Sequence, residues 1–168
     1  MLRDLDILSQ LAKDNLVSIE QELDYVKKYI YLLEFRYPDK FTVIWDINDD
    51  VLAYKIVKLS IQPLVENAVY HGIKPKRQKG SITIRSYLNG NTICLEVEDD
   101  GVGLKEEKVD EIKTLLSQDY TVEVEHLGLR NINQRVKLIF GEEFGITLKS
   151  KLNQGSIVTI TIPSIKKM

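Results

Sequence analysis

The chain has 168 residues, of which 43% are hydrophobic and 29% are charged, and its formal net charge is -2. This length is sufficient for one domain with its own core, and the charge excludes a general nucleic-acid binder, which needs a basic surface. The single cysteine, Cys94, excludes an internal disulfide and lies in an apolar run, as is typical of a buried thiol in a reducing compartment.

The N-terminal part of the chain predicts two helices. Leucines at three-residue steps over residues 2–16 indicate a short amphipathic helix. Ser18 and Gln21 form a capping box that starts a second helix near residue 19, and Pro38 ends it. Its apolar residues alternate steps of four and three: Ile19, Leu23, Val26, Ile30 and Leu33. Such a stripe either packs on its own domain or forms a coiled-coil seam with a second chain, and the sequence leaves both open.

The rest of the chain alternates strands with helices. Alternating residues predict a strand over Phe41–Ile47, and a central helix follows from about residue 57 to residue 71, with Gly72 as its C-cap. Further strands are predicted at 81–88, 92–98, 146–151 and 157–162, and further helices at 105–116 and from residue 129 to residue 139. With a hairpin turn at Asn89 and Gly90, this order predicts an α+β fold. We expect a two-layer sandwich whose mixed, mostly antiparallel sheet carries helices on one face, preceded by N-terminal helices.

The central helix carries two different faces. One face is apolar and would join the core: Ile61, Leu64, Val65, Ala68 and Val69. The other places Pro63, Asn67, Tyr70 and His71 together, with the carboxylate of Glu66 beside them. An amide oxygen and a carboxylate on a rigid helix suit Mg²⁺, which prefers oxygen ligands. The alternative is an amphipathic helix with a polar face toward solvent.

Two later segments combine glycine with polar residues. Asp99 ends an apolar strand, where a buried carboxylate can accept a hydrogen bond from the exocyclic amine of a base, and Gly101 and Gly103 let the backbone approach a ligand. Gly128 stands where a helix begins, and the free N–H groups of a helix start bind phosphate. Taken singly, the segments are equally typical of a turn and of a helix N-cap. The sequence has neither a Walker lysine motif nor a dinucleotide fingerprint after a strand, so a nucleotide site would be of another kind.

In this order, the segments resemble the ATP-binding catalytic domain of bacterial sensor histidine kinases of the LytS/YesM type. These kinases belong to the gyrase, chaperone, histidine kinase and MutL ATPase superfamily, which has the Bergerat fold. The matching segments are residues 62–72 for the N box, 99–103 and 128–131 for the two glycine boxes, and 155–163 for the closing glycine-plus-strand motif. The resemblance covers nearly the whole chain. It implies an N-terminal helical segment, residues 1–38, that ends a dimerisation or linker region, and an ATP-binding kinase domain, residues 39–168.

The resemblance also implies a role for each matching residue. Asn67 would bind a Mg²⁺ ion that bridges the phosphates of ATP, and Glu66 would lie beside the metal. Asp99 would accept the adenine amino group, with Ser156 supporting it, and residues 105–127 would form a lid. Gly101 and Gly103 would lie under the base and ribose, and Gly128 and Leu129 would cap the phosphates. The expected ATP site comprises Asn67, Tyr70, His71, Asp99, Gly101, Gly103, Leu104, Leu127, Gly128, Leu129 and Ser156, with Asn67 and Glu66 at the metal.

The implied function is that of a protein-histidine kinase in a two-component system, which donates the γ-phosphoryl group of ATP to a histidine. Neither histidine of the chain, His71 or His126, lies in the Pro-His-Phe context of the acceptor. We therefore expect the acceptor on a segment missing from this chain, no catalytic residue within it, and no autophosphorylation by it alone. The implied partners are its own dimerisation and phosphoacceptor segment and a response regulator. The full-length protein is expected to be a membrane-anchored homodimer, with this domain in the cytoplasm.

Two residues depart from the pattern of this kinase type, and a third departs from that of its ATP-hydrolysing relatives. Asp100 replaces an asparagine and adds negative charge near the phosphates, and Tyr70 stands where a lysine is frequent. Pro63 stands four residues before Asn67, where ATP-hydrolysing relatives carry a general-base glutamate, so vigorous ATP hydrolysis is not expected. Two alternatives remain: a degenerate interaction module without enzymatic activity, which Asp100 and Tyr70 favour, and an ATP-hydrolysing relative, which Pro63 disfavours.

Overall fold

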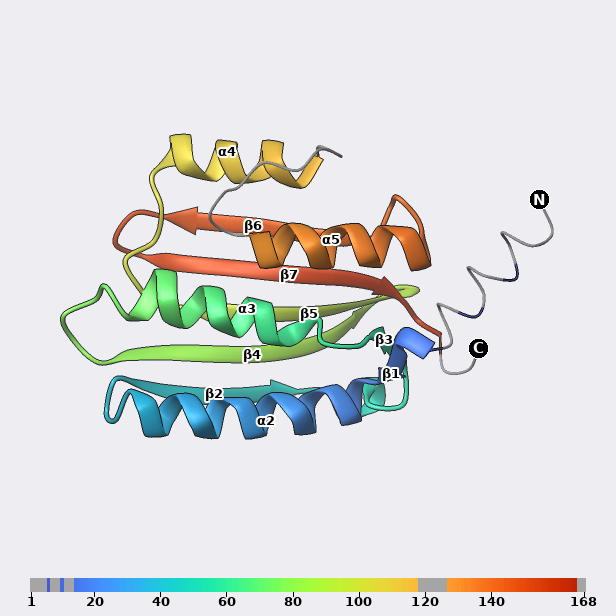
Figure 1. The fold of residues 1–168 in the computed structure, drawn as a ribbon, viewed down its shortest axis with the longest axis horizontal. Coiled ribbons are helices and arrows are strands. Elements are labelled where there is room, and N and C mark those ends of the chain that lie inside the picture. The colour runs from blue at the N-terminus through green and yellow to red at the C-terminus, as the bar shows by residue number, and fades with distance from the viewer. Residues whose placement is uncertain (1–5, 7–9, 11–13, 118–126, 166–168) are drawn as a thin grey trace.

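A computed structural model describes residues 6, 10, 14–117 and 127–165 of the chain. Within these ranges a five-stranded sheet has the strand order β2-β4-β5-β7-β6 (Figure 1). The strands are β2 (Phe41–Ile47), β4 (Gly80–Asn89), β5 (Thr92–Asp99), β6 (Gly145–Lys151) and β7 (Gly155–Pro163). β2 pairs with β4 in parallel, and the other neighbours are antiparallel. The predicted α+β fold with a mixed, mostly antiparallel sheet is confirmed.

Four helices cover one face of this sheet (Figure 1). They are α2 (Ile19–Arg36), α3 (Ile61–Asn67), α4 (Glu106–Ser117) and α5 (Leu127–Phe140). α2 contacts α3, α3 contacts α5, and α5 contacts α4, so the helices form one continuous layer. The core lies between this layer and the sheet, where Ile82 and Ile84 of β4 are buried. None of the helices in the described ranges has both the length and the apolar content that crossing a bilayer requires.

α2 begins at the predicted capping box. The Ser18 hydroxyl accepts a hydrogen bond from the Gln21 N–H at 3.1 Å, and the Gln21 side chain accepts one from the Ser18 N–H at 3.0 Å. The apolar stripe of α2 is buried in the core of its own chain: Ile19, Leu23, Val26, Ile30 and Leu33. Packing on its own domain therefore accounts for this stripe. The leucines that predicted an earlier helix lie outside the described residues.

The central helix starts later than predicted. A short strand, β1 (Leu16–Ser18), pairs antiparallel with β3 (Lys55–Val57), and no sequence pattern predicted either strand. The predicted start at residue 57 is wrong because Val57 pairs in β3 and Leu59 has a left-handed φ of 60°, which interrupts any helix. Asn48 caps a single 3₁₀ turn (Asp49–Val51), and the chain then reaches α3 through β3.

The end of the central helix also differs from the prediction. α3 continues as a π-helical segment, η2 (Ala68–Ile73), in which the Lys74 N–H donates to the Val69 carbonyl, five residues back, at 2.8 Å. Gly72 lies inside η2, so its predicted role as a C-cap is wrong. A side chain at residue 72 would overlap the Asp99 carboxylate, which explains why glycine stands there. π-helical turns of this kind frequently mark functional positions.

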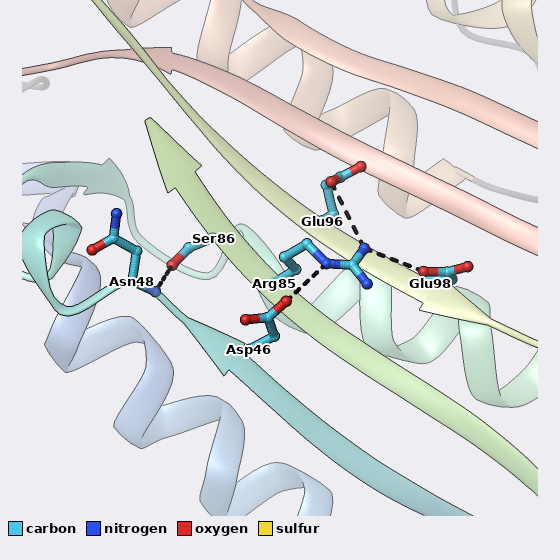
Figure 2. Close-up of polar contacts among 6 residues, drawn as sticks. All are labelled: Asp46, Asn48, Arg85, Ser86, Glu96 and Glu98. Atoms are coloured by element: carbon cyan, nitrogen blue, oxygen red, sulfur yellow. Dashed lines mark hydrogen bonds and ion pairs between the residues drawn. The ribbon is translucent and has the colours of Figure 1, made fainter. Parts of the chain in front are cut away.

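The opposite face of the sheet carries a charge network that joins three strands (Figure 2). The Arg85 guanidinium on β4 donates to Asp46 of β2 at 3.1 Å and to Glu98 of β5 at 3.2 Å, and lies 3.9 Å from Glu96. Arg85 pairs directly with Asp46 in the parallel β2–β4 ladder. The network therefore ties the parallel edge strand to the antiparallel part of the sheet.

Candidate functional site

A cavity of about 150 Å³ lies where α3 and η2 meet the start of α5. Its lining residues are Pro63, Glu66, Asn67, Tyr70, His71, Gly128 and Leu129. The predicted second face of the central helix therefore lines one cavity, and it is joined there by the predicted helix start at Gly128. A Cβ atom at Gly128 would lie 3.3 Å from Pro63 Cβ, so glycine allows the two helices this close approach.

The polar groups of the cavity come mainly from the central helix. The Asn67 side chain is only 8% exposed. Glu66 Oε1 accepts hydrogen bonds from the Tyr29 hydroxyl at 3.2 Å and from Gln62 Nε2 at 3.0 Å. Tyr70 packs edge-on against Tyr37, with ring centroids 6.2 Å apart. Within the described residues no group of three or more His, Cys, Asp or Glu side chains is arranged to hold a metal alone. An amide and a carboxylate fit a Mg²⁺ ion that takes its remaining ligands from phosphate and water.

Asp99 lies behind this cavity wall rather than among its lining residues. It ends β5, is 3% exposed, and faces Gly72, the residue after the cavity-lining His71. Asp99 Oδ1 accepts a hydrogen bond from the Gly101 N–H at 2.9 Å. Burial raises the pKa of Asp99 to about 6, although this hydrogen bond opposes the shift. Near pH 6 such a carboxyl is present in both neutral and ionised forms. The ionised form can accept a hydrogen bond from a ligand amine.

Gly101 and Gly103, which follow Asp99, let their loop pack closely against the backbone of neighbouring segments. A side chain at Gly101 would overlap the backbone of Gly72, and one at Gly103, whose φ is 63°, would overlap the Lys151 carbonyl. The Val102 N–H donates to the Gly72 carbonyl at 3.0 Å. The loop after β5 is thereby fixed against η2 and the β6–β7 turn. The predicted role of both glycines beneath a base and ribose stays a prediction.

Ser156 and Leu104 are connected through Ser150, a residue that the sequence did not indicate. Ser156 pairs with Asp99 across the β5–β7 ladder, and its hydroxyl lies 2.7 Å from that of Ser150. The Ser150 hydroxyl also accepts from the Leu104 N–H at 2.9 Å, across 46 positions of sequence. Leu104 itself lines a different groove, of about 720 Å³, between α4 and β6. No local sequence signal marks Ser150, because its role arises only when β6 and the loop after β5 come together.

The acidic residue that departs from the family pattern is neutralised by a neighbour. Asp100 Oδ1 accepts from the Ser81 N–H at 2.8 Å and lies 3.3 Å from Lys76 Nζ. Lys76 also donates to the Asp100 carbonyl at 3.0 Å. The extra charge of Asp100 is therefore balanced locally, and its carboxylate is engaged at the start of β4.

The region that the resemblance assigns to a lid is only partly described. Its first part forms α4, which buries Val109 and Ile112 against the core. Residues 118–126, including His126, lie outside the described residues. Leu127 is the first residue of α5, but its side chain also lies outside the description. The lid stays a prediction.

Comparison with known families assigns most of the described fold to one group of proteins. The family described as "Histidine kinase-, DNA gyrase B-, and HSP90-like ATPase" matches residues 55–166. That segment contains the central helix, Asp99, Gly128 and Ser156.

Curated relatives are sensor kinases. The chain is 36% identical over 155 residues to the sensor histidine kinase YpdA of Escherichia coli, covering 92% of this chain and 26% of that protein. It is 34% identical over 155 residues to the sensor protein LytS of Staphylococcus saprophyticus, covering 92% and 26%. It is 31% identical over 151 residues to the sensor histidine kinase YesM of Bacillus subtilis, covering 90% and 24%. The chain thus spans about a quarter of the length of these relatives.

Solved structures of similar fold are also histidine kinase domains. A nucleotide-free catalytic domain of the histidine kinase ThkA superposes with a TM-score of 0.63 at 18% identity, covering 90% of this chain and 97% of that one. The histidine kinase domain of a blue-light activated kinase from Erythrobacter litoralis gives 0.61 at 20% identity, covering 88% and 62%. At these identities the likeness shows the fold, which is the Bergerat fold predicted from the sequence motifs.

Proposed function

The chain belongs to the histidine kinase-, DNA gyrase B- and HSP90-like ATPase family, and we propose from this that it is the ATP-binding catalytic domain of a LytS/YesM-type sensor histidine kinase. The observation that supports this most is the convergence of the N-box residue Asn67 with Gly128 of the second glycine box on one cavity. Residues far apart in sequence meet there, and an amide oxygen beside the free N–H groups of a helix start suits a metal-bound phosphate chain.

The cavity suits the phosphate end of the nucleotide. Its volume of about 150 Å³ is below the ~300–1,000 Å³ that holds a whole small ligand. Asn67 and Glu66 would hold Mg²⁺, which neutralises phosphate charge when bound. The first-turn N–H groups of α5, at Gly128 and Leu129, would receive the phosphate oxygens. Tyr70 and His71 would complete the wall around them.

The adenine would lie toward Asp99. The buried carboxylate would accept a hydrogen bond from the adenine amino group, and its fixed position comes from the Gly101 N–H and the pairing with Ser156. Gly101 and Gly103 would let the chain pass beneath the base and ribose, and Leu104 and Leu127 would belong to the same nucleotide site.

We further propose that the phosphoryl group goes to a histidine on a phosphoacceptor segment outside this chain, and then to a response regulator. The full-length protein would be a homodimer anchored in the membrane, with this domain in the cytoplasm. The division of the chain at residue 38 stays a prediction, with α2 packed on the core of the domain that follows it.

The transfer reaction tests this proposal. The 168-residue chain is mixed with a peptide hairpin that carries the acceptor histidine of the same kinase, in the presence of Mg²⁺ and labelled ATP. We expect acid-labile label on the histidine, and none when the hairpin is omitted. Unlabelled histidine in a mixture whose nucleotide binding has been verified would contradict the kinase assignment.

The two alternatives receive less support. An ATP-hydrolysing relative needs a base four residues before Asn67, and Pro63 forms the cavity wall there. Asp100 and Tyr70 favour a degenerate module that binds no nucleotide, but Lys76 lies 3.3 Å from the Asp100 carboxylate and balances its charge. Neither alternative is favoured by a separate observation in the described residues.

ATP affinity is expected to weaken as the pH falls below about 6, the pKa of Asp99 in the free protein. Contact with the adenine amine favours the ionised carboxylate, so binding lowers that pKa and releases a proton below pH 6. Affinity should fall by about tenfold per pH unit there and stay constant above neutrality. Calorimetric titrations from about pH 5 to about pH 8 measure this. Asp100→Asn is the control: it removes one of the charges that raise the pKa of Asp99, so it should keep the dependence but move it to slightly lower pH. A flat profile for the unchanged chain would contradict the role of Asp99.

A further inference from the structure

Glu66 of the cavity wall is hydrogen-bonded by a residue of α2, the helix that precedes the matched motifs. Tyr29 of α2 and Gln62 of α3 both donate to the same oxygen of Glu66, Oε1, at 3.2 and 3.0 Å. Tyr29 lies 37 positions before Glu66 in the sequence. This contact therefore exists only because α2 packs beside α3 in the helix layer.

The Tyr29 hydroxyl is a dependable donor. The side chain is half-buried, and burial together with the nearby Glu66 charge raises the pKa of Tyr29 well above its usual value. Since a phenol titrates near pH ~10 even when it is exposed, the Tyr29 hydroxyl carries its proton at neutral pH and can donate. A hydrogen bond from a neutral donor to a carboxylate is stronger than one between two neutral groups.

Two further contacts fix α2 relative to the cavity. At one end, Glu22 accepts the N–H groups of Leu59, Ser60 and Ile61, where α3 begins. At the other end, Tyr37 packs edge-on against the cavity-lining Tyr70. Tyr29 lies between these two contacts, so its hydroxyl is held at a constant position beside Glu66.

We propose that Tyr29 is a positioning residue for the metal end of the site. By binding Oε1, it holds the Glu66 carboxylate in one orientation at the cavity, ready to receive Mg²⁺ or its bound water. Partners of this kind, one shell outside a metal ligand, commonly contribute about 10–100-fold to metal affinity. The inference rests on the proposed function, because it presumes that Mg²⁺ and ATP occupy the cavity.

The test is a comparison of ATP dissociation constants with Mg²⁺ and with EDTA for the unchanged chain and for Tyr29→Phe. This substitution keeps the ring and removes only the hydroxyl. We expect the Kd with Mg²⁺ to rise about tenfold and the Kd with EDTA to stay the same. Tyr31→Phe, on the same helix and 70% exposed, is the matched control and should behave like the unchanged chain.

The other outcomes would overturn either the role of Tyr29 or the proposed function, and the two can be told apart. Equal weakening with Mg²⁺ and with EDTA would make Tyr29 a merely structural support and overturn the inference, as would an unchanged Kd in both. In Glu66→Gln, adding Tyr29→Phe should have little further effect, since the carboxylate that it positions is already gone. If the unchanged chain binds no ATP under either condition, the proposed function itself fails.

Discussion

Asp99→Asn is expected to weaken ATP binding about 100-fold, because an amide replaces the ionised acceptor for the adenine amine. The substitution should not weaken the fold. Burial raises the pKa of Asp99, so the folded chain disfavours the ionised carboxyl above about pH 6. An uncharged amide removes that cost, and its oxygen can still accept from the Gly101 N–H. The free energy of unfolding near neutral pH should therefore be equal to or above that of the unchanged chain.

Two measurements on the same samples separate a role of Asp99 in ATP binding from a role in the stability of the fold. Fluorescence or calorimetric titration with Mg²⁺ and ATP gives the affinity, and urea unfolding gives the stability. The control is Asp100→Asn, whose carboxylate bonds to Ser81 and Lys76 rather than pointing toward a base. Loss of affinity accompanied by equal loss of stability would show that Asp99 supports the fold and not the ligand.

Glu22→Gln should lower the free energy of unfolding by about 3 kcal/mol and the thermal midpoint by roughly 6–12 °C. Glu22 is 2% exposed and accepts from the N–H groups of Leu59, Ser60 and Ile61 at 3.0, 2.8 and 3.2 Å. The Ser60 side chain does not cap α3, because its hydroxyl is bonded to the Val57 carbonyl. The Glu22 carboxylate of α2 therefore caps the N-terminus of α3 and interacts favourably with the dipole of that helix.

An amide in place of Glu22 leaves at least one of these N–H groups facing another donor. Urea unfolding at several temperatures measures the loss. Glu20→Gln, an exposed position in the first turn of the same helix, should change the free energy of unfolding by less than about 0.5 kcal/mol. Equal stabilities for the two variants would show that α3 begins without help from Glu22.

The motif residues and the helix faces could be predicted from the sequence because both depend on local spacing. The apolar stripe of α2 and its capping box follow from steps of three and four residues, and the cavity-lining face of α3 follows from the same rule. The hairpin of β4 and β5 was indicated by Asn89 and Gly90, although the two loop residues are Gly90 and Asn91. The boundaries of these two strands differ from the prediction by at most one residue at each end.

The features that the sequence could not show arise from contacts between distant segments. Glu22 reads as one of several charges on an amphipathic helix, and only the packing of α2 on α3 makes it a cap. Gly72 is typical of a helix end, yet it is required inside a π-helical turn by the carboxylate of Asp99. The β1–β3 pairing joins three-residue segments that are too short to give an alternating pattern.

The most direct test is a structure of the chain with Mg²⁺ and a non-hydrolysable ATP analogue. We expect the adenine amine within hydrogen-bond distance of Asp99, the metal bound by Asn67, and the phosphates at the start of α5 near Gly128. Chemical-shift changes on titration should concentrate at the same three positions. An analogue bound elsewhere, or a complex in which Asn67 and Gly128 contact neither metal nor phosphate, would contradict the proposed function.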